Sequence, residues 1–296
     1  MNIENIEFVS ETGLLDVAGS SLEYRLLGPP PETAPTIVML HEGLGSVSMW
    51  RDFPERLLQA TGLGVFAYSR KGYGRSSACQ LPRPLSYMHD EALDVLPGVL
   101  ESIGFRRGIL LGHSDGASIA AIYAGGRDDP RVRGLILMAP HFFTEDEGIE
   151  SIARIKADFH TTDLRRRLYK YHGDNVDGAF RGWNDAWLDP EFRRWDIREF
   201  LKNICVPVLI LQGEEDEYGS EKQIDAARVR CGASVETVLL PRCAHAPHKD
   251  QPQRTLDEIL SFVIRISDSC ASSSSEDNES ERNEAAPRRV SKQETY

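Results

Sequence analysis

The segment GILLGHSDGASIA, residues 108–120, places a serine where an apolar, strand-like run gives way to small residues suited to a helix. Gly112 and Gly116 flank Ser114 in the pattern Gly-x-Ser-x-Gly, which needs this strand–turn–helix context. The glycines allow strand and helix to approach closely, so the turn projects the serine hydroxyl from the edge of a sheet. We therefore predict that Ser114 is a nucleophile.

A serine hydroxyl is a weak nucleophile and needs a general base. Among the eight histidines, His245 in LPRCAHAPH follows the last expected strand and precedes the last expected helix. That position is the carboxyl edge of the sheet, to which Ser114 also points. His248 is the alternative base. The other histidines are expected to be structural or solvated, with His113 pointing away from the serine: His41, His89, His113, His141, His160 and His172.

The base needs a carboxylate that orients it. The segment LILQGEEDEYG supplies Asp216 shortly after the end of a strand, with Glu214, Glu215 and Glu217 as alternatives. The order serine, aspartate, histidine is the chain order of one hydrolase fold. We take Asp216 as the acid.

An oxyanion needs N–H donors, and the backbone N–H of Asp115 is the first candidate. The second should come from the loop HEGLGS, residues 41–46. That loop has no second histidine for a zinc motif, no dinucleotide-binding glycine spacing and no phosphate-binding lysine. His245 and His248 form a His-x-x-His pair without further ligands, so we expect no metal and no cofactor.

These residues must be positioned by alternating strands and helices, which predict a mostly parallel sheet flanked by helices, an α/β fold. A β-hairpin is expected in about the first thirty residues. The later strands are expected at 36–40, 63–69, 107–113, 132–140, 206–213 and 235–241. The expected helices cover residues 49–61, 87–104, 117–126, 220–230 and 252–266.

The chain is divided by these patterns into a core at residues 1–140 and 204–266, a helical cap at 141–203 and a disordered tail at 267–296. The cap segment has amphipathic helical pieces without clear strands. Its Trp183 and Trp187 are candidate substrate-binding residues, or serve only to hold the cap together. The tail is rich in serine and glutamate and has too few large apolar residues to offset its ordering entropy.

The length of 296 residues suits one large domain with an insertion. The net charge of −12 disfavours binding to nucleic acid or to an anionic membrane. No secretory signal or membrane span is evident. Five scattered cysteines indicate neither a disulfide framework nor a zinc site and favour a reducing cytoplasm.

From about residue 20 to 266 the sequence resembles the α/β-hydrolase family in LHEGLG, YSRKGYGRS, GHSDGAS, QGEEDEYG and CAHAPH. The resemblance implies Ser114 as nucleophile, Asp216 as acid and His245 as base. It also implies oxyanion donors at Asp115 and Gly43.

Two residues depart from the family pattern. Glu42 replaces a glycine in the oxyanion loop, and we expect its carboxylate to turn away or to bind substrate. Ser69 replaces the family's usual aspartate. Dehalogenases and epoxide hydrolases carry an aspartate in place of the nucleophilic serine, so these chemistries are excluded.

The leading interpretation is a carboxylesterase-type serine hydrolase that acts on small-molecule esters through an acyl-enzyme. One alternative is cleavage of a carbon–carbon bond beside a ketone, as in meta-cleavage product hydrolases, with Arg181 of the cap offsetting the substrate's charge. A further alternative is a noncatalytic binding protein on the same fold. The sequence leaves the oligomeric state open.

Overall fold

A single twisted sheet runs through the protein. The computed structural model describes residues 9–284, and the side chains of residues 9–268. The strands lie in the order β1-β2-β4-β3-β5-β6-β7-β8. Only the pairs β1–β2 and β2–β4 are antiparallel. Their bounds are β1 Val9–Val17, β2 Ser20–Gly28, β3 Thr36–Leu40, β4 Gly64–Tyr68, β5 Gly108–His113, β6 Val132–Met138, β7 Val208–Gly213 and β8 Val235–Leu240.

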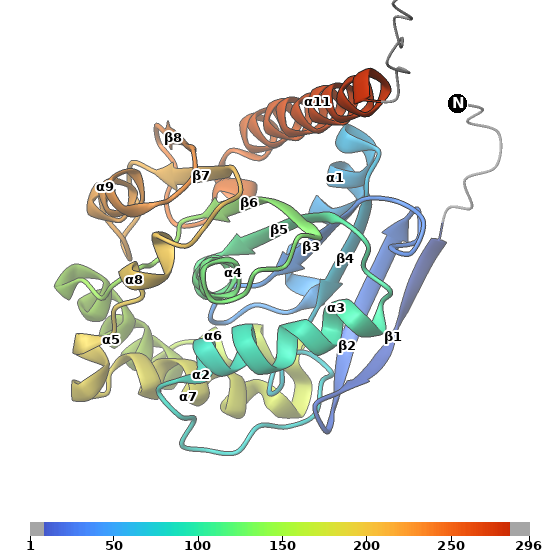
Figure 1. Cartoon of the computed structure of the whole chain (residues 1–296). Coiled ribbons are helices and arrows are strands. Elements are labelled where there is room, and N and C mark those ends of the chain that lie inside the picture. Colours follow the sequence, from blue (N-terminus) through green and yellow to red (C-terminus); the bar gives the residue numbers. More distant parts are fainter. Residues whose placement is uncertain (1–8, 285–296) are drawn as a thin grey trace, which may run out of the picture.

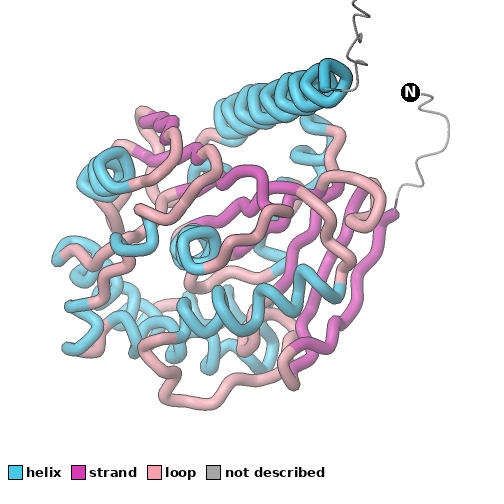
Figure 2. Tube along the Cα trace, in the orientation of Figure 1, coloured by secondary structure: helices cyan, strands magenta, loops and turns pink. Residues whose placement is uncertain are grey.

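The mostly parallel sheet predicted from the sequence is confirmed, and helices cover both of its faces (Figures 1 and 2). Because side chains alternate along a strand, neighbours such as Ile37 and Val38 enter different cores. Ile37 packs in the core that contains residues of α1, Phe53–Thr61, and α11, Pro252–Glu284. Val38 packs with residues of α3, Leu96–Ser102, α4, Asp115–Gly126, and α9, Glu221–Arg230. Burial on both faces explains why the central strands read as continuous apolar runs.

Short helical segments complete the core. A π-helical turn, η2, joins α2 to α3, so one expected helix at 87–104 is a continuous but irregular helical segment. The remaining bounds here are η1 Val47–Trp50, α2 Tyr87–Asp90, η2 Glu91–Val95 and α10 Pro247–Asp250.

Between β6 and β7 the described chain consists of helices and loops, with one isolated bridge between Phe143 and Asp196. The helices are α5 Asp146–Thr161, α6 Leu164–His172, η3 Gly173–Asn175, α7 Val176–Trp187, η4 Pro190–Arg194 and α8 Arg198–Leu201. We refer to residues 141–203 as the helical insertion. In Figure 1 its helices lie at the opposite end of the molecule from α11.

Helix α11 runs to Glu284, beyond the end expected from the sequence at residue 266. Residues 267–284 are therefore helical, in contrast to the expectation of disorder. The apolar part of α11 docks on the sheet through residues such as Ile259 and Phe262, and a helix that is already nucleated can extend through polar residues. For residues 285–296, outside the described range, disorder stays a prediction. Within the described chain, no helix is both long and apolar enough to cross a membrane.

Candidate active site

Ser114 occupies a sharp turn between β5 and α4. Its backbone has φ 53° and ψ −118°, a conformation that costs a non-glycine residue about 1–3 kcal/mol. The flanking glycines make the turn possible. A Cβ atom on Gly116 would lie 2.0 Å from the Leu40 carbonyl oxygen, and one on Gly112 would lie 2.3 Å from the Gly116 carbonyl oxygen. The Gly-x-Ser-x-Gly segment therefore adopts the sharp turn between strand and helix that was expected from its sequence.

His245 and Asp216 form a direct pair across two loops. Nδ1 of His245 lies 2.8 Å and 2.9 Å from the two Asp216 carboxylate oxygens. Oδ1 also accepts the N–H of Tyr218 at 2.8 Å, and Oδ2 accepts Nε2 of Gln212 at 2.6 Å. These bonds hold the carboxylate, with 1% of the side chain exposed, in one orientation.

The pair shifts the pKa of each partner. Burial alone would raise the pKa of Asp216, but the charge and hydrogen bond of His245 and the Tyr218 N–H hold it below its ordinary value. Burial alone would lower the pKa of His245, but Asp216 raises it above the ordinary value of about 6.5. Since Nδ1 faces Asp216, Nε2 of His245 is left for chemistry.

The alternative residues lie elsewhere. His248 is buried against Trp50 and Phe53, with ring-centroid distances of 4.9 Å and 5.3 Å. Neither of its ring nitrogens has a hydrogen-bond partner within the described chain. Glu214, Glu215 and Glu217 are exposed at the surface. The geometry therefore favours His245 and Asp216 over these residues.

A small cavity of about 100 Å³ brings Ser114 and His245 together. Trp183 and Trp187 of α7 and Ile152 of α5 form its wall on the side of the helical insertion. The full lining is Glu42, Gly43, Leu44, Ser114, His141, Ile152, Trp183, Trp187, Tyr218 and His245. Asp115 and Asp216 are absent from this lining because Asp115 is directed into the core and Asp216 lies behind His245.

Four cavity residues were not predicted from the sequence: Leu44, His141, Ile152 and Tyr218. His141 was expected to be structural or solvated, yet its ring centroid lies 5.6 Å from that of His245. It directly follows the expected strand at 132–140, so its place at the carboxyl edge of the sheet was a usable signal. The other three residues, Leu44, Ile152 and Tyr218, had no such signal.

Two backbone N–H groups adjoin the serine. Asp115 is the first residue of α4, so its N–H has no acceptor within the helix. The N–H of Gly43 has no hydrogen-bond partner among the described residues. Trp183 packs directly on this loop, since a Cβ atom on Gly43 would lie 2.2 Å from its indole nitrogen. Neither N–H group therefore has a hydrogen-bond acceptor among the described residues.

The side chain of Asp115 belongs to a buried network behind the cavity. Oδ2 accepts the Tyr87 hydroxyl at 2.6 Å and lies 3.9 Å from Nη2 of Arg70. The indole N–H of Trp187 donates to the same Tyr87 hydroxyl at 3.0 Å. The network thereby ties the cavity wall to the residue after Ser114.

No group of three or more histidine, cysteine, aspartate or glutamate side chains within residues 9–268 could hold a metal ion.

Residues 37–258 match the sequence profile described as the alpha/beta hydrolase family. The chain belongs to this family. It is 26% identical over 277 residues to the bifunctional esterase/perhydrolase DCH of Acinetobacter calcoaceticus, covering 83% of this chain and 96% of that protein. It is 30% identical over 241 residues to proline iminopeptidase of Lactobacillus helveticus, covering 69% and 81% of the two chains. The fold also matches carboxylesterase CesB of Bacillus subtilis, with a TM-score of 0.63, 19% identity and coverage of 86% and 92%.

Ser69 stands where the family pattern has an aspartate, and Glu23 supplies a carboxylate beside it. The Ser69 hydroxyl donates to Oε2 of Glu23 at 2.8 Å, and the N–H of Arg75 donates to the same oxygen at 3.0 Å. Glu23 lies on β2, which pairs with β4, the strand that ends just before Ser69. A carboxylate is therefore still present beside this loop, supplied from elsewhere in the sequence.

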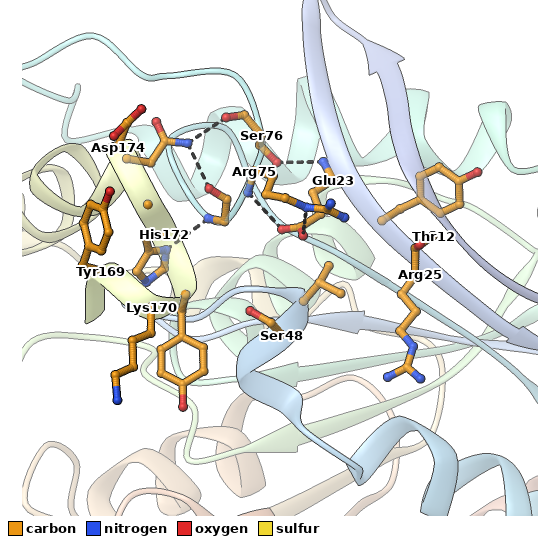
Figure 3. Close-up of a pocket in the computed structure, with 16 residues that line it drawn as sticks. Thr12, Glu23, Arg25, Ser48, Arg75, Ser76, Tyr169, Lys170, His172 and Asp174 are labelled. Carbon is orange, nitrogen blue, oxygen red and sulfur yellow. Dashed lines mark hydrogen bonds and ion pairs between the residues drawn. The ribbon is translucent and has the colours of Figure 1, made fainter. Parts of the chain in front are cut away.

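Glu23 also borders a second cavity of about 830 Å³, between the hairpin β1–β2, η1 and the end of α6 (Figure 3). His172 lies in the wall of this cavity, and Ser114 does not line it. In Figure 3 Arg75 points toward Glu23, while Lys170 and Arg25 lie on opposite sides of the view. This larger cavity is distinct from the one that contains the serine.

Proposed function

We propose that this alpha/beta hydrolase is a serine hydrolase of small carboxylic esters. Ser114 is the nucleophile, His245 the general base and Asp216 the residue that orients it. The observation that carries the proposal is the Asp216–His245 pair, at 2.8 Å and 2.9 Å, beside a cavity that a strained Ser114 also lines.

In the first step Ser114 Oγ attacks the ester carbonyl carbon while its proton passes to Nε2 of His245. The N–H groups of Gly43 and Asp115 stabilise the negative oxygen of the tetrahedral intermediate. Collapse of the intermediate breaks the bond to the alcohol, which takes the proton from His245. Water then attacks the acyl-enzyme by the same route, releasing the acid and restoring the serine.

The charges of the cavity favour an ester over the anionic keto-dienoate of a carbon–carbon hydrolase. The lining contains neither lysine nor arginine, and the carboxylate of Glu42 is paired with Lys249, so neither kind of cation is left for a substrate carboxylate. The side chain of Arg181, the candidate partner for a substrate carboxylate, is 60% exposed, and its Nε lies 3.5 Å from Oδ2 of Asp185. Arg181 is also absent from the cavity lining. We further propose that the insertion at 141–203 acts as a cap whose Trp183 and Trp187 contact the acyl group.

The test combines a substrate panel with active-site labelling. We expect turnover of short p-nitrophenyl esters, negligible turnover of 2-hydroxy-6-oxo-dienoates, and little of proline p-nitroanilide, which probes the activity named for the Lactobacillus helveticus relative. Labelling by a fluorophosphonate should occur in the wild type and be absent in Ser114→Ala. If the dienoate or the anilide were cleaved faster than the esters, the proposed substrate class would be wrong. Absence of fluorophosphonate labelling in the wild type would indicate a noncatalytic protein.

A cytoplasmic location is also a proposal. Its support is that Cys79, Cys205, Cys231 and Cys243 are all free thiols. A reducing compartment keeps thiols in this state.

A further inference from the structure

The proposed mechanism makes no use of three ionisable side chains beside the cavity: Glu42, His113 and Lys249. They come from separate elements. Glu42 follows β3, His113 ends β5, and Lys249 lies in α10, shortly after His245 in the chain. Glu42 also occupies the position at which the sequence departs from the family pattern.

The Glu42 carboxylate is directed between the other two. Oε1 lies 3.4 Å from Nζ of Lys249, and Oε2 lies 3.6 Å from Nδ1 of His113. The loop leaves room for this arrangement because position 45 is glycine. A Cβ atom on Gly45 would lie 2.3 Å from Oε2 of Glu42.

The cluster reaches the backbone of the proposed base. Nε2 of His113 lies 2.7 Å from the carbonyl oxygen of His245. A carbonyl can only accept, so Nε2 of His113 carries the proton and donates it. Burial lowers the pKa of His113, so the ring is neutral and its Nδ1 faces Glu42 without a proton and without a hydrogen bond to any described residue. On the other side, the carbonyl oxygen of Glu42 accepts from Nη2 of Arg70 at 3.1 Å and from the N–H of Gly45 at 3.0 Å. Both ends of the Glu42 residue are therefore held.

We propose that Glu42 is a positioning residue that, through its ion pair with Lys249, holds the oxyanion loop and the His245 loop in a fixed relation to each other. The inference rests on the proposed function, in which Gly43 on the first loop and His245 on the second act on the same intermediate. A displacement of either loop would separate the base from the oxyanion donors. Catalysis depends steeply on such distances.

The ion pair also resolves an electrostatic problem. An unpaired carboxylate beside the oxyanion would oppose the negative charge that develops there. Burial alone would raise the pKa of Glu42, but the charge of Lys249 holds it well below its ordinary value, so the carboxylate is ionised and paired with Lys249. A paired carboxylate can therefore occupy a position where relatives carry glycine.

A positioning role differs from substrate binding in its kinetic signature. Loss of a contact to the substrate raises KM, whereas a displaced loop lowers kcat with little change in KM. The two single variants Glu42→Gln and Lys249→Met, with their double variant, separate these cases. Lys202→Met is the matched control, because Nζ of Lys202 donates to Oε2 of Glu199 at 2.6 Å in an exposed pair at the end of α8.

We expect Glu42→Gln and Lys249→Met each to lower kcat about tenfold on a p-nitrophenyl ester, which corresponds to about 1.4 kcal/mol, with KM nearly unchanged. The kcat of the double variant should be no lower than that of the less active single variant, because both substitutions break the same contact between Glu42 and Lys249. Lys202→Met should match the wild type. Circular dichroism and melting temperature establish that each variant is folded.

The pH profile adds a readout that a purely structural role would not move. Glu42→Gln removes a negative charge near His245, lowers its pKa and shifts the acid limb of kcat/KM to lower pH. Lys249→Met removes a positive charge and should shift the limb to higher pH. The ionisable groups facing His245 from all packed elements are Glu42, His113, His141, Asp216, Glu217, Tyr218, His248 and Lys249. Only the first and last of these groups change in the two variants.

Wild-type kcat in folded Lys249→Met, additive losses in the double variant, or a change in KM alone would overturn the positioning role. Failure of the proposed function has a different result, in which Ser114→Ala retains esterase activity. The rate of fluorophosphonate labelling provides a second measurement, because it needs His245 and the oxyanion donors but no particular acyl group. We expect it to fall with kcat in both single variants.

Discussion

Nε2 of His172, at the end of α6, lies 2.9 Å from the carbonyl oxygen of Leu44. Its other ring nitrogen accepts the N–H of Gly74 at 3.1 Å, so Nε2 carries the proton and donates to Leu44. The imidazole thus joins the helical insertion to the oxyanion loop, one residue after Gly43. The sequence indicated only a structural or solvated histidine here.

Replacement of His172 by phenylalanine should remove both bonds and leave two backbone groups without partners. We expect ester kcat to fall about tenfold and the free energy of unfolding to fall by about 2 kcal/mol. Urea unfolding and steady-state kinetics measure these effects. His160→Phe, at an exposed position of α5, is the control, and equal losses in both variants would refute the assigned role.

Asp216→Asn should lower kcat by about 10³–10⁴-fold while the fold is preserved. The amide cannot stabilise the imidazolium and favours the wrong tautomer of His245. Ester kinetics and circular dichroism test this expectation. Glu214→Gln and Glu215→Gln, exposed on the same loop, should behave like the wild type. Activity in Asp216→Asn with a loss in either glutamine variant would reassign the acid.

The acid limb of kcat/KM should lie above about pH 6.5, the ordinary pKa of histidine. Asp216 raises the pKa of His245, and the protonated ring cannot act as a base, so activity falls as pH drops through that raised value. Burial lowers the pKa of His141 to about 4, so this neighbour stays neutral across the limb. A limb that lies below pH 6 would contradict the assignment of the base.

The Glu23–Ser69 pair predicts a stability cycle. Glu23→Ala should lower the free energy of unfolding by about 2 kcal/mol, because the Ser69 hydroxyl and Arg75 N–H lose their acceptor. Ser69→Asp alone should also destabilise, since two carboxylates would then face each other. The double variant should recover at least half of the loss, as measured by urea unfolding. Additive losses would show that a carboxylate at position 69 cannot replace Glu23.

The cavity beside Ser114, at about 100 Å³, is smaller than the roughly 300 Å³ at the lower end of typical ligand sites. We therefore expect kcat/KM for p-nitrophenyl acetate or butyrate to exceed that for the octanoate at least about tenfold. Trp183→Ala should decrease this ratio by opening the wall formed by α7. The ratio is its own control for a general loss of activity, and an unchanged ratio would exclude Trp183 from the acyl site.

The sequence alone identified the strands, the serine turn and the candidate acid and base, because each depends on a local pattern. Apolar runs of the right length specify buried strands, and the glycines around Ser114 specify a turn in which only a residue without a Cβ atom fits. Chain order then placed Ser114, Asp216 and His245 at the carboxyl ends of parallel strands, which share one edge of the sheet.

Only the tertiary structure decided between close neighbours and joined residues far apart in the chain. His245 and His248 differ by three positions, yet one meets Asp216 and the other packs against Trp50. Glu42 and Lys249 stand 207 positions apart and meet beside the cavity. Likewise, Glu23 supplies a carboxylate beside Ser69 from a different strand. Such contacts depend on how strands and loops pack in three dimensions, and no local periodicity encodes them.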